Sequence, residues 1–294
     1  MRIDAHHHLW DLSAVHYPWL TEKGIVRFFG DPSSIQRDYL LPEFRADAEA
    51  MGFGASVHIQ VGAADPWAEA QWVQSVADQF PDWPLVQVAF CDLTSDNLDA
   101  QLDRLQTLTS VRGVRQIIGR APGEDASTGT NALLEDPKFL TGLKQLGARG
   151  LSFDLQLLPD LMGQTANILA LAPETRIALC HAGSPYDRTP QGLRRWADEL
   201  TALSNLPHVF CKLSGLGMFD HDWNAESVSP IVSTCLSQFG ADRCMFGSNF
   251  PVDSLTSTYR ETVSRHETLI PGSMLDDVFR GTSERFYRIE LRRN

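Results

Sequence analysis

Residues 2–10 read Arg-Ile-Asp-Ala-His-His-His-Leu-Trp, and this stretch decides how the rest of the chain is interpreted. Apolar and polar residues alternate from Ile3 onward, which is typical of a β-strand. Because residues two apart in a strand share a face, His6 and His8 are expected to point together while His7 points away. Two neutral imidazoles at a strand end can bind one divalent metal ion, such as zinc or manganese.

Two simpler explanations of the histidine triplet are the remnant of an expression tag and a polar strand end. A tag usually has about six histidines and lies outside the fold. This triplet instead lies within an apolar strand and is followed by Trp10. The pattern therefore favours a functional pair of histidines.

The composition is that of an ordinary globular protein: 294 residues, of which 43% are hydrophobic and 21% charged. A chain of this length can form one domain, as barrel proteins of this size usually do, so residues 1–294 are expected to form a single domain. The formal net charge of -12 argues against nucleic acid as a partner, because phosphate binding requires basic surface. A small-molecule substrate needs only a local arginine or lysine.

The five cysteines form no CxxC pair, and their number is odd. This favours free thiols in a reducing compartment. The N-terminus lacks the basic start and apolar run of a signal peptide, and no apolar stretch approaches transmembrane length. We therefore expect a cytoplasmic protein with no membrane partner, and a homo-oligomer remains open.

Eight short β-rich runs recur along the chain, separated by segments with helical patterns. The runs are 2–10, 55–62, 85–93, 111–118, 151–158, 176–183, 209–215 and 244–251; the helical segments are 67–79, 98–108, 136–147, 159–171, 191–203, 227–239 and 257–269. Sustained alternation of this kind predicts a parallel α/β protein, and eight strands predict a closed (β/α)8 TIM barrel. The competing fold is a doubly wound open sheet, but no glycine-rich phosphate loop follows the first strand.

Two long segments interrupt the alternation, after the first and fourth strands. Residues 11–43 are rich in aromatic side chains, and residues 119–136 are rich in Gly, Ala and Thr. Barrel enzymes place their active sites at the C-terminal ends of the strands, so these loops are expected to cover or shape a pocket. Residues 274–293 are expected to form a closing C-terminal helix.

Polar residues occupy strand positions that a barrel normally fills with apolar side chains. Each alone is more often structural, but nearly every strand carries one near its C-terminal end. Burying so many is costly unless they bind one another, water, a metal or a ligand. The set comprises His58, Gln60, Arg115, Asp154, Gln156, His181, Lys212, Ser214 and Asn249.

With these residues in view, the chain resembles the amidohydrolase superfamily, in the branch that contains sugar lactonases and pyrone dicarboxylate lactonase. The resemblance covers essentially the whole chain. The motifs that carry it are Asp4-Ala-His6-His7-His8-Leu-Trp10, Gly113-Val-Arg115, His181-Ala-Gly, Lys212-Leu-Ser214-Gly and Met245-Phe-Gly-Ser-Asn249-Phe-Pro251-Val-Asp253. It implies a barrel fold and the hydrolysis of C–O or C–N bonds.

The resemblance also assigns roles to single residues. His6 and His8 match the metal histidines of strand one, and His181 matches the histidine of strand six. Arg115 falls where lactonases of this branch often hold a carboxylate or carbonyl of the substrate. Asn249 departs from the family pattern, which has an aspartate there as metal ligand and proton shuttle; an amide cannot take up a proton near neutral pH.

A site with two metals is not expected, because Arg115, Gln116 and Ile117 occupy the region where a bridging strand-four residue would lie. One divalent ion, zinc or manganese, on His6, His8 and His181 remains possible, although some lactonases of this branch require no metal. No organic cofactor is expected.

We predict a hydrolase that opens the lactone ring of a sugar acid or small carboxylated lactone by metal-assisted or side-chain-assisted attack of water. The predicted catalytic residues are Asn249, Asp253 and His181; the predicted substrate-binding residues are His58, Arg115, Asp154, Gln156 and Lys212. With Asn249 unable to act as a base, Asp253 is the first choice, followed by Asp154 and His181. Asp253 is equally compatible with capping a helix.

Three alternatives remain open at this point. A metal-dependent decarboxylase of the same superfamily would release carbon dioxide instead of consuming water. A Schiff-base aldolase would use Lys212, but that lysine alone does not explain the paired histidines. A catalytically impaired sugar-acid binding protein would explain Asn249.

Overall fold

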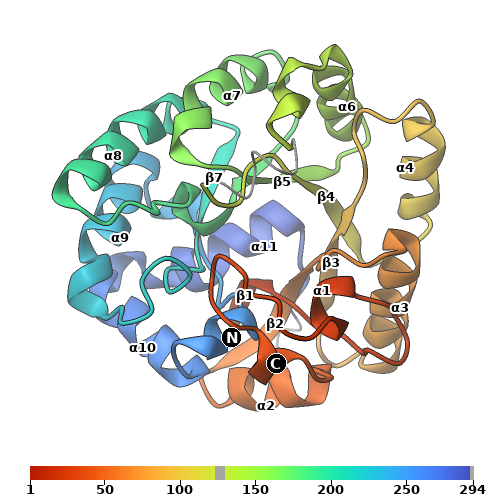
Figure 1. Cartoon of the computed structure of the whole chain (residues 1–294), viewed down its shortest axis with the longest axis horizontal. Coiled ribbons are helices and arrows are strands. Elements are labelled where there is room, and N and C mark those ends of the chain that lie inside the picture. The colour runs from red at the N-terminus through yellow and green to blue at the C-terminus, as the bar shows by residue number, and fades with distance from the viewer. Residues whose placement is uncertain (123–129, 292–294) are drawn as a thin grey trace.

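Eight parallel strands form the centre of the molecule, and helices surround them (Figure 1). The structure is a computed structural model that describes residues 1–122 and 130–291. The strands are β1 (Arg2–His7), β2 (Phe53–Ile59), β3 (Leu85–Phe90), β4 (Val111–Ile117), β5 (Ser152–Gln156), β6 (Ile177–Leu179), β7 (Val209–Leu213) and β8 (Cys244–Phe246). They pair in chain order, each parallel to the next, which confirms the predicted (β/α)8 barrel.

The segment after β8 returns to β1 and brings the two ends of the sheet together. The backbone N–H of Asn249 donates to the His6 carbonyl at 2.7 Å, and the N–H of His8 donates to the Phe250 carbonyl, also at 2.7 Å. Asn249 is thereby held directly beside the two predicted metal histidines.

The seven predicted helical segments all contain a helix, and two further helices, α1 and α2, precede them. The helices are α1 (Pro18–Thr21), α2 (Leu41–Glu49), α3 (Pro66–Gln79), α4 (Leu98–Gln106), α6 (Pro137–Ala148), α7 (Met162–Leu169), α8 (Pro190–Ser204), α9 (Ala225–Phe239), α10 (Tyr259–Leu269) and α11 (Thr282–Tyr287). The sequence signal for α2 was present, since Leu41, Phe44 and Ala48 are buried at helical spacing.

The ends of α6 illustrate how local chemistry sets a helix boundary. The side chain of Asp136, the first residue of the predicted segment 136–147, accepts the Lys138 N–H at 2.8 Å and so caps the helix. The helix continues to Ala148, one residue beyond the predicted segment. A Cβ at Gly147 would lie 2.6 Å from Oγ1 of Thr175, so the glycine permits close packing there.

Several strands are shorter than predicted because the chain leaves the extended conformation where the polar residues begin. His181, Ala182 and Ser184 after β6, and Asn249 after β8, all have positive φ, between 52° and 57°. This conformation is costly for residues other than glycine, and such residues cluster at functional sites. Two of the predicted site residues are therefore held by strained backbone.

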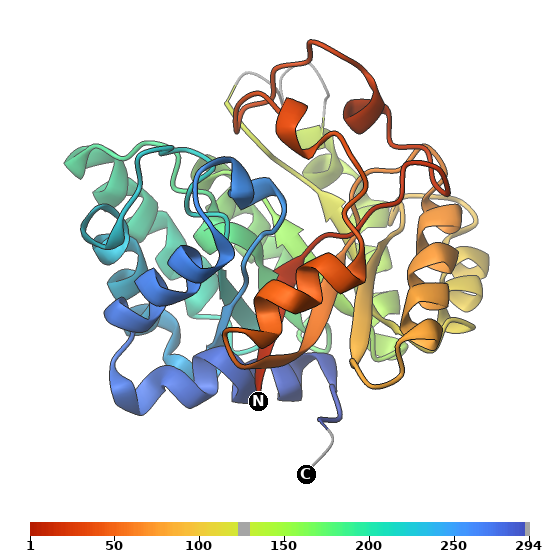
Figure 2. The same ribbon diagram turned by 90° about the horizontal axis from the view of Figure 1, so that it is seen from below.

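The two ends of the barrel differ in what covers them (Figure 2). The segment from residue 11 to α2 rises over the C-terminal ends of the strands, whereas the N-terminus and α11 lie at the opposite end. The predicted C-terminal helix is interrupted: a π-helical turn, Asp277–Gly281, precedes α11. Of the predicted loop 119–136, residues 123–129 lie outside the described residues. Within the described ranges, no helix has the length and apolar character needed to cross a membrane.

Candidate active site

Three imidazole rings meet at the C-terminal end of the barrel. The centroids of the His6 and His8 rings are 5.2 Å apart, and those of His6 and His181 are 4.5 Å apart. His7 points the other way and stacks on Phe44, with 3.9 Å between ring centroids. The alternation predicted for the first strand therefore places His6 and His8 as expected.

Ring nitrogens of His6 and His8 have no hydrogen-bond donor facing their lone pairs among the described residues. Both nitrogens of His6 are buried and have no hydrogen-bond partner among the described residues. His8 Nδ1 lies 2.8 Å from the Ile59 carbonyl, which can only accept, so Nδ1 carries the proton. His8 Nε2 then has a lone pair, yet it faces the Asn249 Oδ1 at 3.3 Å, which is another acceptor. A pair of facing acceptors suits a bound cation between them.

Burial keeps these histidines neutral. Desolvation, followed by neighbouring positive charge, lowers the pKa of His6 and His181 well below the ordinary value. The same causes, with Arg115 the main charge, lower the pKa of His8 to about 3. Neutral imidazole is the form that binds a metal, so the electrostatics suit a metal ligand, whereas a ring with so low a pKa is a weak proton acceptor.

As the side chains stand, no group of three or more His, Cys, Asp or Glu residues within 1–122 and 130–291 is arranged to hold a metal ion. His181 Nδ1 is engaged 3.0 Å from the Ser214 hydroxyl, which leaves Nε2 as the nitrogen that could bind an ion. The donor chemistry of His6 and His8 fits a metal, whereas the three-histidine ligand set stays a prediction.

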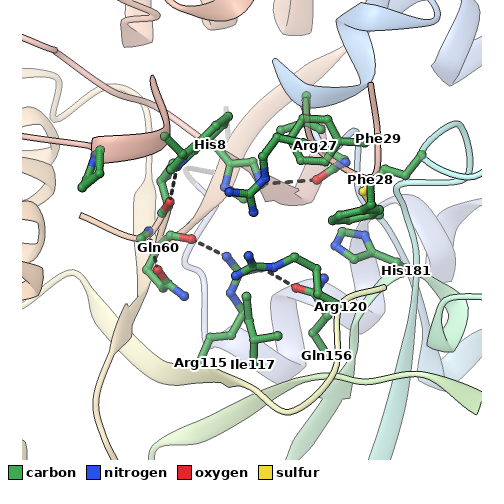
Figure 3. A pocket seen from close by; sticks show the side chains of 17 residues that line it. His8, Arg27, Phe28, Phe29, Gln60, Arg115, Ile117, Arg120, Gln156 and His181 are labelled. Atoms are coloured by element: carbon green, nitrogen blue, oxygen red, sulfur yellow. Dashed lines mark hydrogen bonds between the residues drawn. The ribbon is translucent and has the colours of Figure 1, made fainter. Parts of the chain in front are cut away.

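A cavity of about 270 Å³ opens above the histidines (Figure 3). Five of the predicted site residues line it: His8, Arg115, Gln156, His181 and Asn249. The long segment after β1 contributes Trp19, Arg27, Phe28 and Phe29, and Gln60 and Arg120 add polar surface. The prediction that residues 11–43 shape a pocket is confirmed.

Arg115 is a buried cation at the edge of this cavity. It is 5% exposed; its Nη1 donates to the Gln156 Oε1 at 3.3 Å and its Nη2 donates to the Gln60 carbonyl. Its Nε is buried without a partner among the described residues. A guanidinium held in this way presents a fixed donor surface, which suits a planar carboxylate or a lactone carbonyl.

Asp154 and Lys212 were predicted to bind substrate, and their positions contradict this. Both side chains are fully buried, and neither lines the cavity. Lys212 Nζ donates to the Asp154 carboxylate at 2.5 Å and to the Ala5 carbonyl at 2.8 Å, while the Tyr287 hydroxyl donates to Asp154 at 2.9 Å. The ion pair lies below the cavity, toward the end of the barrel that α11 covers, where both charged groups have hydrogen-bond partners.

His58 was also predicted to bind substrate, and it does not reach the cavity either. It pairs in register with His7, whose side chain points away from the cluster. Its Nδ1 accepts the Leu9 N–H at 3.1 Å, and its Nε2 lies 3.7 Å from Glu69. His58 therefore lies on the outer side of β2.

Asp253, the first choice for a general base, lies behind Asn249 and does not line the cavity. The Asn249 Nδ2 donates to its carboxylate at 2.7 Å. Burial raises the pKa of Asp253 to about 7, against the lowering effect of that hydrogen bond. Asp253 can therefore hold a proton at neutral pH, but it acts on the cavity only through Asn249.

Asp4 belongs to the histidine motif of the first strand but was not among the predicted site residues. Its Oδ1 accepts the N–H groups of His6 and Ser248, and its Oδ2 accepts the Tyr259 hydroxyl at 3.1 Å. Burial raises the pKa of Asp4 to about 6. An acidic residue between two apolar strand positions was the available signal. Asp4 ties the start of the histidine motif to the segment after β8.

Comparisons with known proteins show the family of the chain and agree with its fold. The family model described as amidohydrolase matches residues 3–289. An uncharacterized protein, y4mH, from Sinorhizobium fredii is 34% identical over 98% of both chains, and an L-fucono-1,5-lactonase from Burkholderia multivorans is 28% identical over 98% of this chain and 96% of its own. The crystal structure of an amidohydrolase from Burkholderia multivorans with bound zinc is similar with a TM-score of 0.83, at 26% identity, over 99% of this chain and 100% of that one.

Proposed function

This chain belongs to the amidohydrolase family, and from that premise we propose that it is an enzyme that opens a lactone ring, with a sugar-acid or small carboxylated lactone as substrate. The single observation that carries the proposal is the cavity in which His8, His181 and Arg115 come together. The similarity to an L-fucono-1,5-lactonase supports the same reaction class. The buried, unbonded cysteines are compatible with a cytosolic setting.

In the proposed reaction, Arg115 and Gln156 orient the substrate through its carboxylate or its lactone carbonyl. His181, the one predicted base that lines the cavity, acts as the general base, and a substrate carboxylate on Arg115 would offset one of the charges that lower its pKa. With its Nδ1 proton donated to the Ser214 hydroxyl, its Nε2 has the lone pair that takes a proton from the attacking water. The water oxygen bonds to the carbonyl carbon, the acyl C–O bond of the ring breaks, and the leaving alkoxide takes the proton back from His181. The product is the open hydroxy acid.

A divalent ion would be held by His6 and His8, because His6 has two buried nitrogens without partners and His8 Nε2 faces only an acceptor among the described residues. When bound, such an ion polarises a carbonyl and lowers the pKa of water. Asn249, which lines the cavity, would position His8 and carry no proton itself.

The test is a panel of lactones assayed by acid release, since ring opening produces a carboxylic acid. The protein is treated with chelator and then resupplied with zinc or manganese. We expect turnover of at least one carboxylated or sugar-acid lactone and its loss in the double variant His6→Ala, His8→Ala. His208→Ala is the matched control, because His208 is half-buried and bonds the Leu169 carbonyl away from the cavity. Absence of lactone turnover under every metal condition would exclude the proposal, and release of carbon dioxide would favour a decarboxylase.

A further inference from the structure

Two histidine side chains connect the C-terminal ends of β1 and β2 through a reciprocal pair of hydrogen bonds. The side chain of His8 bonds the backbone carbonyl of Ile59 at 2.8 Å. The side chain of His58, the residue before Ile59, accepts the backbone N–H of Leu9, the residue after His8, at 3.1 Å. Each histidine therefore fixes the backbone next to the other.

The proton position on His58 follows from this contact. A ring nitrogen that accepts a hydrogen bond carries no proton, so Nδ1 is bare and the proton of the neutral ring lies on Nε2. Nε2 lies 3.7 Å from the Oε1 of Glu69, and both side chains are at least 96% buried. Glu69 belongs to α3, which packs outside the barrel.

Glu69 makes a second contact that leads back to the cavity. Its Oε1 accepts the Val61 N–H at 2.7 Å. Arg115 donates to the carbonyl of Gln60, and both Gln60 and Val61 line the cavity. Three consecutive residues, 59–61, are thus held by side chains from three different elements: His8, Arg115 and Glu69.

We propose that Glu69 and His58 are positioning residues, which act from outside the barrel to hold the His8 imidazole and the Gln60–Val61 wall in their working geometry. Neither side chain touches the cavity. The inference builds on the proposed function of the site, but it concerns the orientation of His8 and can be measured without any substrate.

The step from His58 to His8 runs through the backbone. The His8 ring reaches Ile59 only while the two chain segments keep their spacing, and the Leu9 N–H is a buried donor whose partner is His58. Without an acceptor at that point, the donor must seek another partner and the segment after β1 must move. The proton on His8 Nδ1 would then lose its protection from solvent exchange.

The experiment compares His58→Leu with His58→Asn in protein labelled with ¹⁵N on the histidine rings. An asparagine side chain can place its Oδ1 where His58 Nδ1 lies and accept the Leu9 N–H, whereas leucine cannot. We expect exchange of the His8 Nδ1 proton to be about tenfold faster or more in His58→Leu and near the wild-type rate in His58→Asn. The zinc dissociation constant should rise about tenfold or more in His58→Leu and in Glu69→Ala, and less in Glu69→Gln, which keeps an acceptor for Val61.

Asp65→Ala is the matched control for Glu69→Ala. Asp65 caps the same helix by accepting the N–H groups of Trp67 and Ala68, and it is exposed. It should lower the melting temperature without changing the exchange rate of the His8 proton. Equal exchange rates in wild type, His58→Leu and Glu69→Ala would overturn the proposal. Fast exchange in His58→Leu with no lactone turnover in wild type would retain it and remove only the proposed function.

Discussion

The amide nitrogen of Asn249 donates a hydrogen bond of 2.7 Å to the carboxylate of Asp253, inside the barrel and beside His8. An aspartate in place of Asn249 would face a second carboxyl group at hydrogen-bond distance, and two carboxylates so close cannot both be ionised. Between pH 5 and pH 8, we expect Asn249→Asp to lose roughly 2 kcal/mol more unfolding free energy than the wild type loses, the equivalent of one to two pKa units.

The exchanged pair, Asn249→Asp with Asp253→Asn, is the control for that prediction, because it restores one carboxylate and one amide. Thermal unfolding between pH 5 and pH 8 provides the measurement. Identical pH profiles for the single and exchanged variants would show that the two positions are not coupled. A large gain in lactonase rate in Asn249→Asp would instead indicate a hydrolase that has lost its acid–base residue.

The raised pKa of Asp253, about 7, has a consequence for stability. An unfolded aspartate loses its proton near pH 3.9, so between that value and pH 7 the native state binds more protons than the unfolded state. The free energy of unfolding therefore falls as the pH rises across this window, by roughly 4 kcal/mol at most for this one group.

Asp253→Asn removes that contribution. Urea unfolding at pH 5 and pH 8 should show that the wild type loses more stability than the variant over this interval. The comparison between variants is needed because Asp4, with a pKa raised to about 6, acts in the same direction, whereas His8, with a pKa lowered to about 3, acts in the opposite one. A variant whose stability declines as steeply as the wild type would show that Asp253 is ionised at neutral pH.

The barrel and the histidine cluster could be predicted because both follow from spacing along single strands. Strand alternation alone placed His6 and His8 together and His7 away from them. The same alternation would place His58 and Gln60, two residues apart, on one face, and there it fails. The chain leaves β2 after Ile59, so Gln60 turns into the cavity while His58 remains outside.

The sequence pattern also did not predict how deep in the barrel each polar side chain lies. Asp154 and Gln156 lie two residues apart on β5, yet only Gln156 reaches the cavity. Asp154 instead bonds Tyr287, which comes from the far end of the chain. Contacts between residues so distant in sequence leave no local signature.

The Asp154–Lys212 pair should matter for stability and not for substrate affinity. Removing one partner of a buried ion pair leaves an uncompensated charge, which typically costs about 3–5 kcal/mol. We expect Lys212→Met to lose stability on this scale in urea unfolding and to keep the wild-type KM wherever it is folded. Lys138→Met breaks an exposed pair with Asp96 and should change stability little. A folded Lys212→Met protein with a strongly raised KM would return Lys212 to the substrate site.

Arg115 is expected to decide how the substrate is held. Lysine keeps the positive charge but cannot donate to the Gln156 side chain and the Gln60 carbonyl in the fixed fork of a guanidinium. We expect Arg115→Lys to raise KM about tenfold for a lactone that carries a carboxylate, a loss of about 1.4 kcal/mol of binding, with a smaller change in kcat. Arg112→Lys is the control, since Arg112 lies on the same strand, bonds the Thr109 and Val111 carbonyls and does not line this cavity.

Steady-state kinetics on a carboxylated lactone and its neutral ester separate two roles of Arg115. A KM that rises equally for both would mean that Arg115 shapes the Gln60 wall, whereas a rise confined to the charged substrate would mean that it binds the carboxylate.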